Sequence, residues 1–186
     1  LNKDLPIVLV FGGSQGAKSI NATLIEIIKN KTNTNYQIIW ASGPKQYNLI
    51  KDNLKELKIN IDKIKNVKIV PYIYNMEEMM NLADIIISRS GAMTITEVAI
   101  TGKPAIFVPF PFATENHQEY NARVLVNAGA AKIILDKDLN AESLSKTLNE
   151  MLKDKNNLLK MGQNAERIAI KDVEDKIYNE IKRLVK

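Results

Sequence analysis

The segment from residue 85 to residue 122 constrains the fold more than any other part of the chain. An apolar run at residues 85–88 ends before Gly91, and apolar residues at helical spacing follow as far as Gly102. A second apolar run, at residues 105–110, starts directly after a proline that prevents the helix from continuing. The pattern predicts a strand–helix–strand crossover, which makes the two strands parallel. The turn at Gly91 then lies at a carboxyl edge of the sheet, where ligands of open α/β sheets bind.

The remaining chain repeats this alternation, and we interpret residues 1–186 as a single domain. We expect strands at residues 6–11, 36–41, 67–70, 85–88, 105–110 and 131–135. We expect helices at residues 17–30, 45–57, 76–83, 92–101, about 118–128 and 141–153, and one long or two short helices at residues 158–185. Six strands that alternate with helices predict an α/β fold, a Rossmann-like doubly wound parallel sheet.

The composition excludes several classes of function. The chain has no cysteine and one histidine, so thiolate metal sites, disulfides and a cysteine nucleophile are not available. No apolar run is long enough to span a bilayer, and residues 1–4 do not resemble a signal peptide. The start at Leu1 suggests an excised fragment of a longer protein. The formal charge of +5 is best explained by solvated lysines, and we expect no nucleic-acid partner.

A glycine-rich loop at residues 12–16 connects the first strand to the first helix. Free backbone N–H groups and the positive end of the helix dipole suit a phosphate at such a turn. The loop does not match the dinucleotide pattern, and it nearly matches a Walker A loop through Lys18 and Ser19, with Ala17 in place of the last glycine. An ordinary tight turn without a ligand is the alternative interpretation.

Polar residues near the other strand ends are candidates for recognition. Glu97 lies one turn into its helix, where it could accept two hydrogen bonds from a ribose, but Thr94 to Glu97 also has the capping-box pattern. Ile73 could read a base with its backbone or simply anchor a loop in the core. His117 and Gln118 lie in a polar cluster that suits hydroxyl recognition. Asp136 and Asp138 are best explained as helix caps rather than metal ligands.

Four segments taken together resemble the carboxyl-terminal half of the MurG family of bacterial glycosyltransferases. They are GGSQGAKSIN at 12–21, SRSGAMTITE at 88–97, KPAIFVPFPFATENHQEYNA at 103–122 and AGAA at 128–131. The resemblance implies the donor-binding half of the two-domain GT-B architecture, with the amino-terminal acceptor domain absent from this chain. It covers essentially the whole sequence.

The resemblance also implies roles for individual residues. Ser14 would bond a donor phosphate, the backbone of Ile73 would read the uracil with Met76 packed nearby, Glu97 would hold the ribose and Gln118 would contact the sugar. His117 stands where some family members have glutamine. The full set that the resemblance assigns to the sugar nucleotide is Ser14, Gln15, Gly16, Ile73, Met76, Gly91, Ala92, Met93, Thr94, Ile95, Thr96, Glu97, His117 and Gln118. No catalytic residue, metal or cofactor is expected in this fragment.

By this resemblance, the full-length protein would transfer N-acetylglucosamine from UDP-N-acetylglucosamine to a lipid-linked muramyl-pentapeptide in peptidoglycan synthesis, with inversion at the sugar. It would act in the cytoplasm, peripherally on the inner face of the bacterial membrane. Two alternatives stay open, a UDP-sugar epimerase-like domain and a non-catalytic nucleotide-binding module. The isolated fragment is expected to be inactive.

Overall fold

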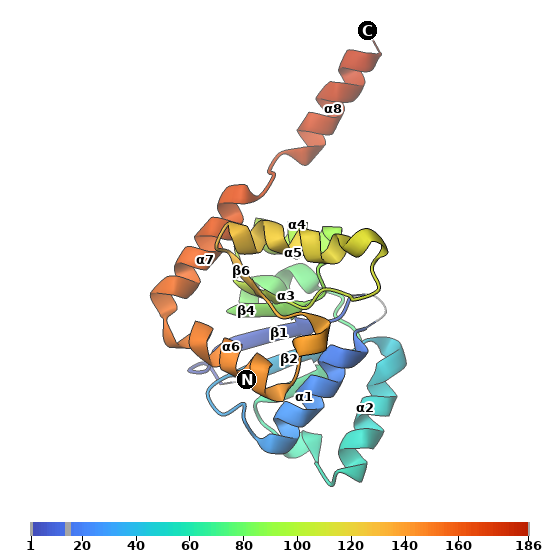
Figure 1. Cartoon of the computed structure of the whole chain (residues 1–186), viewed down its shortest axis with the longest axis vertical. Helices are drawn as coiled ribbons and strands as arrows, with labels where there is room; N and C mark the ends of the chain where they lie inside the picture. The colour runs from blue at the N-terminus through green and yellow to red at the C-terminus, as the bar shows by residue number, and fades with distance from the viewer. Residues whose placement is uncertain (1, 14–15, 186) are drawn as a thin grey trace.

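The structure, a computed structural model, describes residues 2–13 and 16–185. It has a central six-stranded sheet with helices on both sides (Figure 1). The strands are β1 (Ile7–Phe11), β2 (Gln37–Ala41), β3 (Val67–Val70), β4 (Ile85–Ser88), β5 (Ala105–Phe107) and β6 (Ala131–Ile133). The helices are α1 (Lys18–Asn30), α2 (Pro44–Glu56), α3 (Met76–Leu82), α4 (Ala92–Thr101), α5 (His117–Asn127), α6 (Ala141–Lys153), α7 (Lys155–Ile168) and α8 (Val173–Leu184).

The strand order is β3-β2-β1-β4-β5-β6, and every adjacent pair is parallel. The order reverses between β1 and β4, so the loops after these two strands leave the sheet next to each other. A crevice outside the carboxyl ends of the strands forms at such a reversal. The predicted α/β fold with a doubly wound parallel sheet is confirmed.

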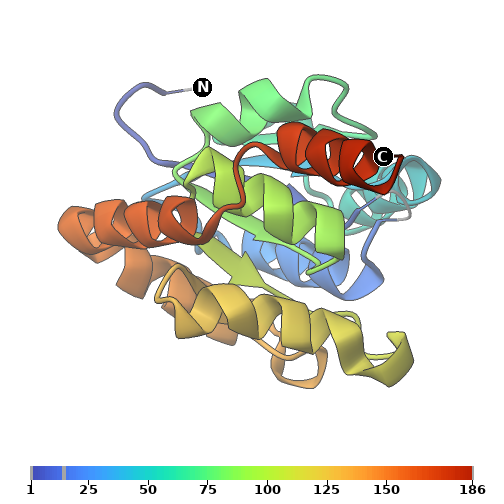
Figure 2. The ribbon, with the colours of Figure 1, turned by 90° about the horizontal axis from the view of Figure 1, so that it is seen from above.

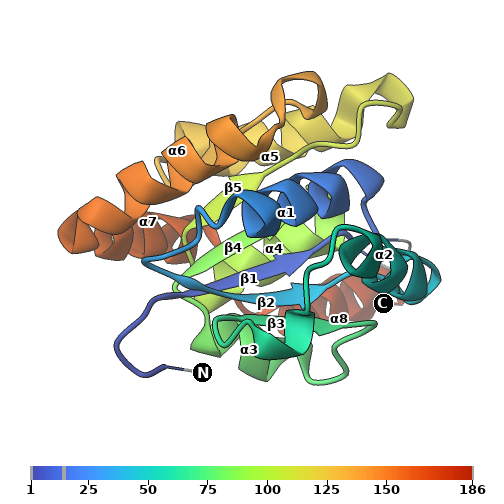
Figure 3. The ribbon, with the colours of Figure 1, turned by 90° about the horizontal axis from the view of Figure 1, so that it is seen from below.

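Each face of the sheet is covered by its own set of helices. Helices α1, α2 and α6 lie on one face, as seen from below (Figure 3), and α3, α4 and α5 lie on the other, as seen from above (Figure 2). Alternate residues of each strand enter the two cores: Val8 and Val10 pack with α1, whereas Leu9 and Phe11 pack on the side of α4. Burial on both faces explains why the strands are continuous apolar runs.

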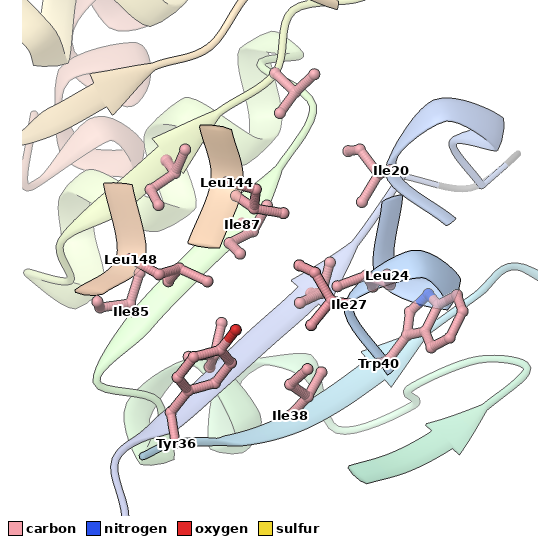
Figure 4. Close-up of a cluster of buried hydrophobic side chains, with 14 of the residues drawn as sticks. Ile20, Leu24, Ile27, Tyr36, Ile38, Trp40, Ile85, Ile87, Leu144 and Leu148 are labelled. Carbon is pink, nitrogen blue, oxygen red and sulfur yellow. The ribbon is translucent and has the colours of Figure 1, made fainter. Parts of the chain in front are cut away.

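Large side chains of α1 and β2 fill the first core. Leu24 and Ile27 of α1 lie against Ile38 and Trp40 of β2, and all four are almost inaccessible to solvent (Figure 4). Burying a side chain of this size stabilises the fold by about 1.5–3 kcal/mol. The packing fixes the start of α1, and with it the glycine-rich loop, against the end of β2.

Two strands end earlier than the sequence predicts. β5 stops at Phe107 rather than at residue 110, and β6 stops at Ile133 rather than at residue 135. Val108 still donates its N–H to the Ser88 carbonyl at 2.9 Å, but Pro109 has no N–H and ends the ladder. The freed residues 108–112 form the loop that borders the functional site.

The last part of the chain forms separate helices. Helix α7 packs against α4 and α6, whereas the residues 169–172 break the helical path and α8 extends away from the body (Figure 1). No residue of α8 is buried, and the apolar side chains of Ile177 and Ile181 are 55% and 56% exposed. Within residues 2–13 and 16–185, no helix is long and apolar enough to cross a bilayer.

Candidate functional site

A cleft of about 660 Å³ opens at the carboxyl edge of the sheet. Its walls come from the glycine-rich loop and the start of α1, the turn after β4, the loop after β5, the amino end of α5 and the segment after β6. All of these segments follow parallel strands, so their positions are set by the topology of the sheet. The cleft lies where the reversal of strand order predicts a ligand site.

The glycine-rich loop folds tightly against the start of α1. Gly16 has φ of +74°, and a Cβ atom there would lie 2.7 Å from the carbonyl oxygen of Ser42. A Cβ on Gly12 would lie 2.2 Å from the backbone nitrogen of Ala17. Both positions therefore require glycine, because a side chain would collide with backbone. Ser14 and Gln15, which the sequence predicts as phosphate contacts, lie outside the described residues.

A buried amide holds α1 in place behind this loop. The side chain of Asn21 accepts the indole N–H of Trp40 at 2.9 Å and donates to the carbonyl of Ser42 at 3.0 Å. Asn21 is 4% exposed, so neither bond can be replaced readily by water. These bonds couple the start of α1 to the end of β2.

Helix α4 begins at Ala92, directly after Gly91, and no side chain caps its amino end. The capping box at Thr94 is therefore absent, which leaves Glu97 free of that structural role. Glu97 is exposed and its carboxylate has no hydrogen bond within the described part of the chain, and partial desolvation raises the pKa of that carboxyl above its ordinary value. The other predicted residues of α4 are partly or largely exposed, and Met93 is 72% exposed.

Gln118 connects the start of α5 to the turn after β4. Its Oε1 atom accepts the backbone N–H of Phe110 at 3.0 Å and that of Ser90 at 3.3 Å. Ser90 Oγ donates to the carbonyl of Gln118 at 2.7 Å, and Asn121 donates to the carbonyl of Ser90 at 3.1 Å. The NH2 group of Gln118 has no partner among the described residues, so it can donate to a ligand in the cleft.

Arg89 forms the floor of the cleft. Its Nη1 atom donates to the carbonyls of Val108 and Pro109, at 3.1 and 2.9 Å, and to Asp136 Oδ1 at 2.5 Å. Its Nη2 atom donates to Ser19 Oγ at 3.0 Å, and Ser19 Oγ donates to the same Asp136 oxygen at 2.6 Å. One guanidinium thus connects the exits of β4, β5 and β6 to the start of α1.

Ile73 and Met76 do not line this cleft. The side chain of Ile73 is 6% exposed and packs in the core on the α4 side of the sheet, as the loop-anchor interpretation predicts. Its backbone N–H and carbonyl have no hydrogen-bond partner within the described residues, so they can pair with the edge of a base. Ile73 also borders a separate hollow of about 450 Å³ between β3 and α3.

The predicted residues therefore fall into two groups. Gly16, Gly91, Thr94 and Gln118 line the cleft, whereas the other described ones do not. His117 points its Nδ1 at the carbonyl of Thr114, at 2.8 Å, outside the cleft lining. Glu119, in the same polar cluster, has its pKa lowered by hydrogen bonds from Asn116 and Arg123.

Sequence reasoning missed several residues that line the cleft. The sequence pattern gives no separate role to Arg89, explains Lys18 and Ser19 as an imperfect Walker motif and Asp136 as a cap, and places Phe110 in a strand. Arg89 and Asp136 follow the ends of parallel strands, and this position alone would have marked them as candidates. In the described part of the chain, no three His, Cys, Asp or Glu side chains form a potential metal site.

The sequence of nearly all of this fold matches the model of a known protein family. The family model described as the glycosyltransferase family 28 C-terminal domain matches residues 7–177. The chain belongs to that family. The predicted resemblance is therefore confirmed for residues that include the cleft.

Curated relatives of this family 28 domain carry a specific name. The UDP-N-acetylglucosamine--N-acetylmuramyl-(pentapeptide) pyrophosphoryl-undecaprenol N-acetylglucosamine transferase of Acetivibrio thermocellus is 40% identical over 185 residues, which is 99% of this chain and 49% of the relative. The protein with the same name from Thermoanaerobacter sp. is 43% identical over 181 residues, or 97% of this chain and 49% of the relative. The chain thus spans about half the length of the curated relatives it matches.

Solved structures agree with this assignment of the family 28 domain. The crystal structure of Acinetobacter baumannii MurG superposes with a TM-score of 0.83 at 30% identity, covering 98% of this chain and 51% of that one. The UDP-GlcNAc 2-epimerase of Neisseria meningitidis superposes with a TM-score of 0.65 at 14% identity, over 98% of this chain and 45% of that one. The second likeness concerns the fold alone.

Proposed function

We propose that this chain is the donor-binding half of an inverting glycosyltransferase. The longer protein would transfer N-acetylglucosamine from UDP-N-acetylglucosamine to a lipid-linked muramyl-pentapeptide during peptidoglycan synthesis. The observation that carries the proposal is the convergence of the glycine-rich loop, the Gly91 turn and Gln118 on one cleft, in a chain of the family 28 domain. The names of the relatives support the choice of donor and acceptor.

The donor would lie across the carboxyl edge of the sheet. Its diphosphate faces the loop at residues 12–16 and the start of α1, where backbone N–H groups and the helix dipole favour negative charge. The sugar lies toward Gln118, whose NH2 group donates to a sugar oxygen. The uridine lies toward Glu97 and Ile73, with the Glu97 carboxylate on the ribose hydroxyls and the Ile73 backbone on the uracil.

The proposed reaction is a single displacement. A hydroxyl of the acceptor attacks the anomeric carbon, the bond to the diphosphate oxygen breaks, and uridine diphosphate leaves with the bonding electrons. The negative charge that develops on the diphosphate is stabilised by the uncapped backbone N–H groups and the dipole at the start of α1, which lowers the barrier. The acceptor site and the base that removes the hydroxyl proton belong to the rest of the longer protein. The isolated chain therefore binds donor weakly and transfers nothing.

An epimerase-like activity is the second candidate, favoured only by the shared fold. Such an enzyme needs acid and base groups close to the sugar. Glu119 is held by Arg123 and Asn116, and His117 by the Thr114 carbonyl, and neither residue lines the cleft. Product analysis with the longer protein separates the candidates: a lipid-linked disaccharide indicates transfer, an epimerised nucleotide indicates isomerisation, and neither indicates a binding module.

We place the longer protein in the cytoplasm, peripherally at the inner face of the bacterial membrane, because the acceptor is a lipid. This chain would then work beside the membrane rather than in it. Fractionation of cells that express the longer protein tests the location. Recovery with membranes that is reversed by high salt is expected, and recovery in the cytosolic fraction alone would contradict it.

Calorimetric titration of the chain tests the donor site. UDP-N-acetylglucosamine, UDP-glucose, ADP-ribose and ATP are compared in the wild type and in Glu97→Ala. We expect binding of the uridine sugars alone, weakened in the variant by about 1–3 kcal/mol because charged hydrogen bonds are lost. Preference for ATP, or no effect of Glu97→Ala, would refute the proposed site.

A further inference from the structure

Asp136 brings a negative charge into the cleft where the donor diphosphate is proposed to bind. It lies in the short 3-10 helix Asp136–Asp138 after β6, and it lines the same cleft as the glycine-rich loop. Its side chain is 21% exposed, and one of its oxygens accepts hydrogen bonds from both Arg89 and Ser19. A carboxylate in this position repels a diphosphate, so its presence needs an explanation.

The partner of Asp136 supplies the first part of that explanation. Arg89 is the other charged group on the floor of the cleft, and its side chain is 12% exposed. At 2.5 Å the two charges form a compact ion pair. The fields of two opposite charges so close together largely cancel at the distance of a bound ligand. Arg89 therefore adds little net attraction for an anion in the cleft.

The remaining charge in the cleft comes from Lys18. This residue is the first of α1, it is exposed, and it has no partner within the described residues. Backbone N–H groups at the uncapped start of α1 and Lys18 thus supply the attraction for a diphosphate, and the Arg89–Asp136 pair supplies the shape of the floor. The cleft has two cationic side chains, Lys18 and Arg89, and only the charge of Lys18 is not offset by Asp136.

We propose that Asp136 limits the affinity of the cleft for the diphosphate by neutralising Arg89, so that uridine diphosphate is released after transfer. The proposal rests on the function proposed above. It makes Asp136 a positioning and charge-balancing residue that does not touch the reacting atoms. It also assigns a role to Ser19, the last residue of the near-Walker sequence, as the hydroxyl that orients the ion pair.

The substitution Asp136→Asn separates the charge of this residue from its geometry. The amide oxygen of asparagine accepts from Arg89 and Ser19 as the carboxylate does, and the carbonyls of Val108 and Pro109 still hold the guanidinium. A purely structural role predicts weaker or unchanged binding in this variant. Charge balancing predicts the opposite, tighter binding of an anion.

The experiment is a titration of the wild-type chain, Asp136→Asn and Asp138→Asn with uridine diphosphate and with uridine, at low and high salt. Asp138 is the matched control, because it is an exposed acid two residues away that does not line the cleft. We expect Asp136→Asn to bind uridine diphosphate roughly three to ten times more tightly at low salt. The gain should shrink at high salt, and uridine should bind equally to all three proteins.

Three other outcomes would each refute the inference, and each points to a different cause. Equal or weaker binding of uridine diphosphate by Asp136→Asn refutes the charge-balancing role while the donor site stands. An equal gain in Asp138→Asn assigns the effect to the overall charge of the chain. Failure of the wild type and both variants to bind uridine diphosphate refutes the proposed function, and the inference with it.

Discussion

The Oε1 atom of Gln118 accepts the backbone N–H of Phe110 at 3.0 Å, and this bond fixes which end of the amide faces the cleft. Two N–H groups, those of Phe110 and Ser90, converge on Oε1, so the NH2 group is left for the ligand. The cleft therefore presents a hydrogen-bond donor at this point. A sugar oxygen fits it, because an oxygen can accept.

Substitutions of Gln118 separate its two roles. In Gln118→Ala, two backbone N–H groups lose their acceptor, and we expect the free energy of unfolding to fall by about 1–3 kcal/mol. In Gln118→Glu, the acceptor is kept but the donor is replaced by a charge, so stability should change little while affinity for UDP-N-acetylglucosamine falls at least several-fold. Denaturant unfolding and calorimetry measure the two effects. Equal donor affinity in Gln118→Glu and wild type would contradict the assignment.

The proposed role of Glu97 predicts that donor binding depends on pH. Only the carboxylate form can accept hydrogen bonds from two ribose hydroxyls, and partial desolvation raises the pKa of the Glu97 carboxyl above its ordinary value. On acidification, affinity for UDP-N-acetylglucosamine should therefore begin to fall at a higher pH than an ordinary glutamate would give. The diphosphate of this donor is a diester, so its own charge stays constant through that range. Glu97→Gln should bind more weakly and lose the pH dependence, and an unchanged profile in that variant would exclude Glu97 as the titrating group.

Lys18 should strengthen binding at a cost in stability. It occupies the first position of α1, where no acidic residue offsets the positive end of the helix dipole. We expect Lys18→Gln to bind uridine diphosphate several-fold more weakly. Its free energy of unfolding should be higher than that of the wild type by about 0.3–1 kcal/mol.

Lys29 is the matched control for that substitution. It lies in the last turn of the same helix, where a cation is favourable, so Lys29→Gln should destabilise the chain slightly and leave binding unchanged. Chemical denaturation and calorimetry measure the two properties. Loss of both stability and binding in Lys18→Gln would show a structural role instead.

The buried amide of Asn21 should stabilise the fold through its two hydrogen bonds. Asn21→Leu leaves the Trp40 N–H and the Ser42 carbonyl without their partner in a dry core. The expected loss is about 1–3 kcal/mol for each unsatisfied group. Urea unfolding followed by tryptophan fluorescence measures it, because Trp40 is the single tryptophan. A change within 0.5 kcal/mol, typical of surface sites, would contradict the role of the amide.

Helix α8 should contribute nothing to the stability of the isolated chain. None of its residues is buried, and we propose that its apolar side packs against the rest of the longer protein. Removal of residues 172–186 should leave the free energy of unfolding within about 0.5 kcal/mol and reduce self-association at high concentration. Unfolding curves and light scattering measure these quantities. A marked loss of stability would show that α8 folds back onto the domain.

Much of the fold follows from local patterns. Continuous apolar runs such as 7–11 and 85–88 indicate strands buried on both faces, and Gly102 with Pro104 ends α4 where the sequence predicts. Asn140 caps α6 through a capping box with Ser143, a signal carried by neighbouring residues. The ends of β5 and β6 were less predictable, because an apolar residue such as Val108 can be buried in a loop as well as in a strand.

The sequence by itself determined the alternation of strands and helices and the glycine positions of the first loop, because each depends on residues close together in the chain. It also determined the family, through four short segments that are each continuous in the chain and occur in a fixed order. Only the tertiary structure decided which groups share the cleft. Ser19, Arg89 and Asp136 are separated by up to 117 residues and meet because they follow the carboxyl ends of parallel strands, β1, β4 and β6, which lie along one edge of the same sheet. The helix start at Ala92, which removes the capping box from Glu97, was likewise decided by where β4 ends. Such contacts depend on the order of strands across the sheet, which no local pattern encodes.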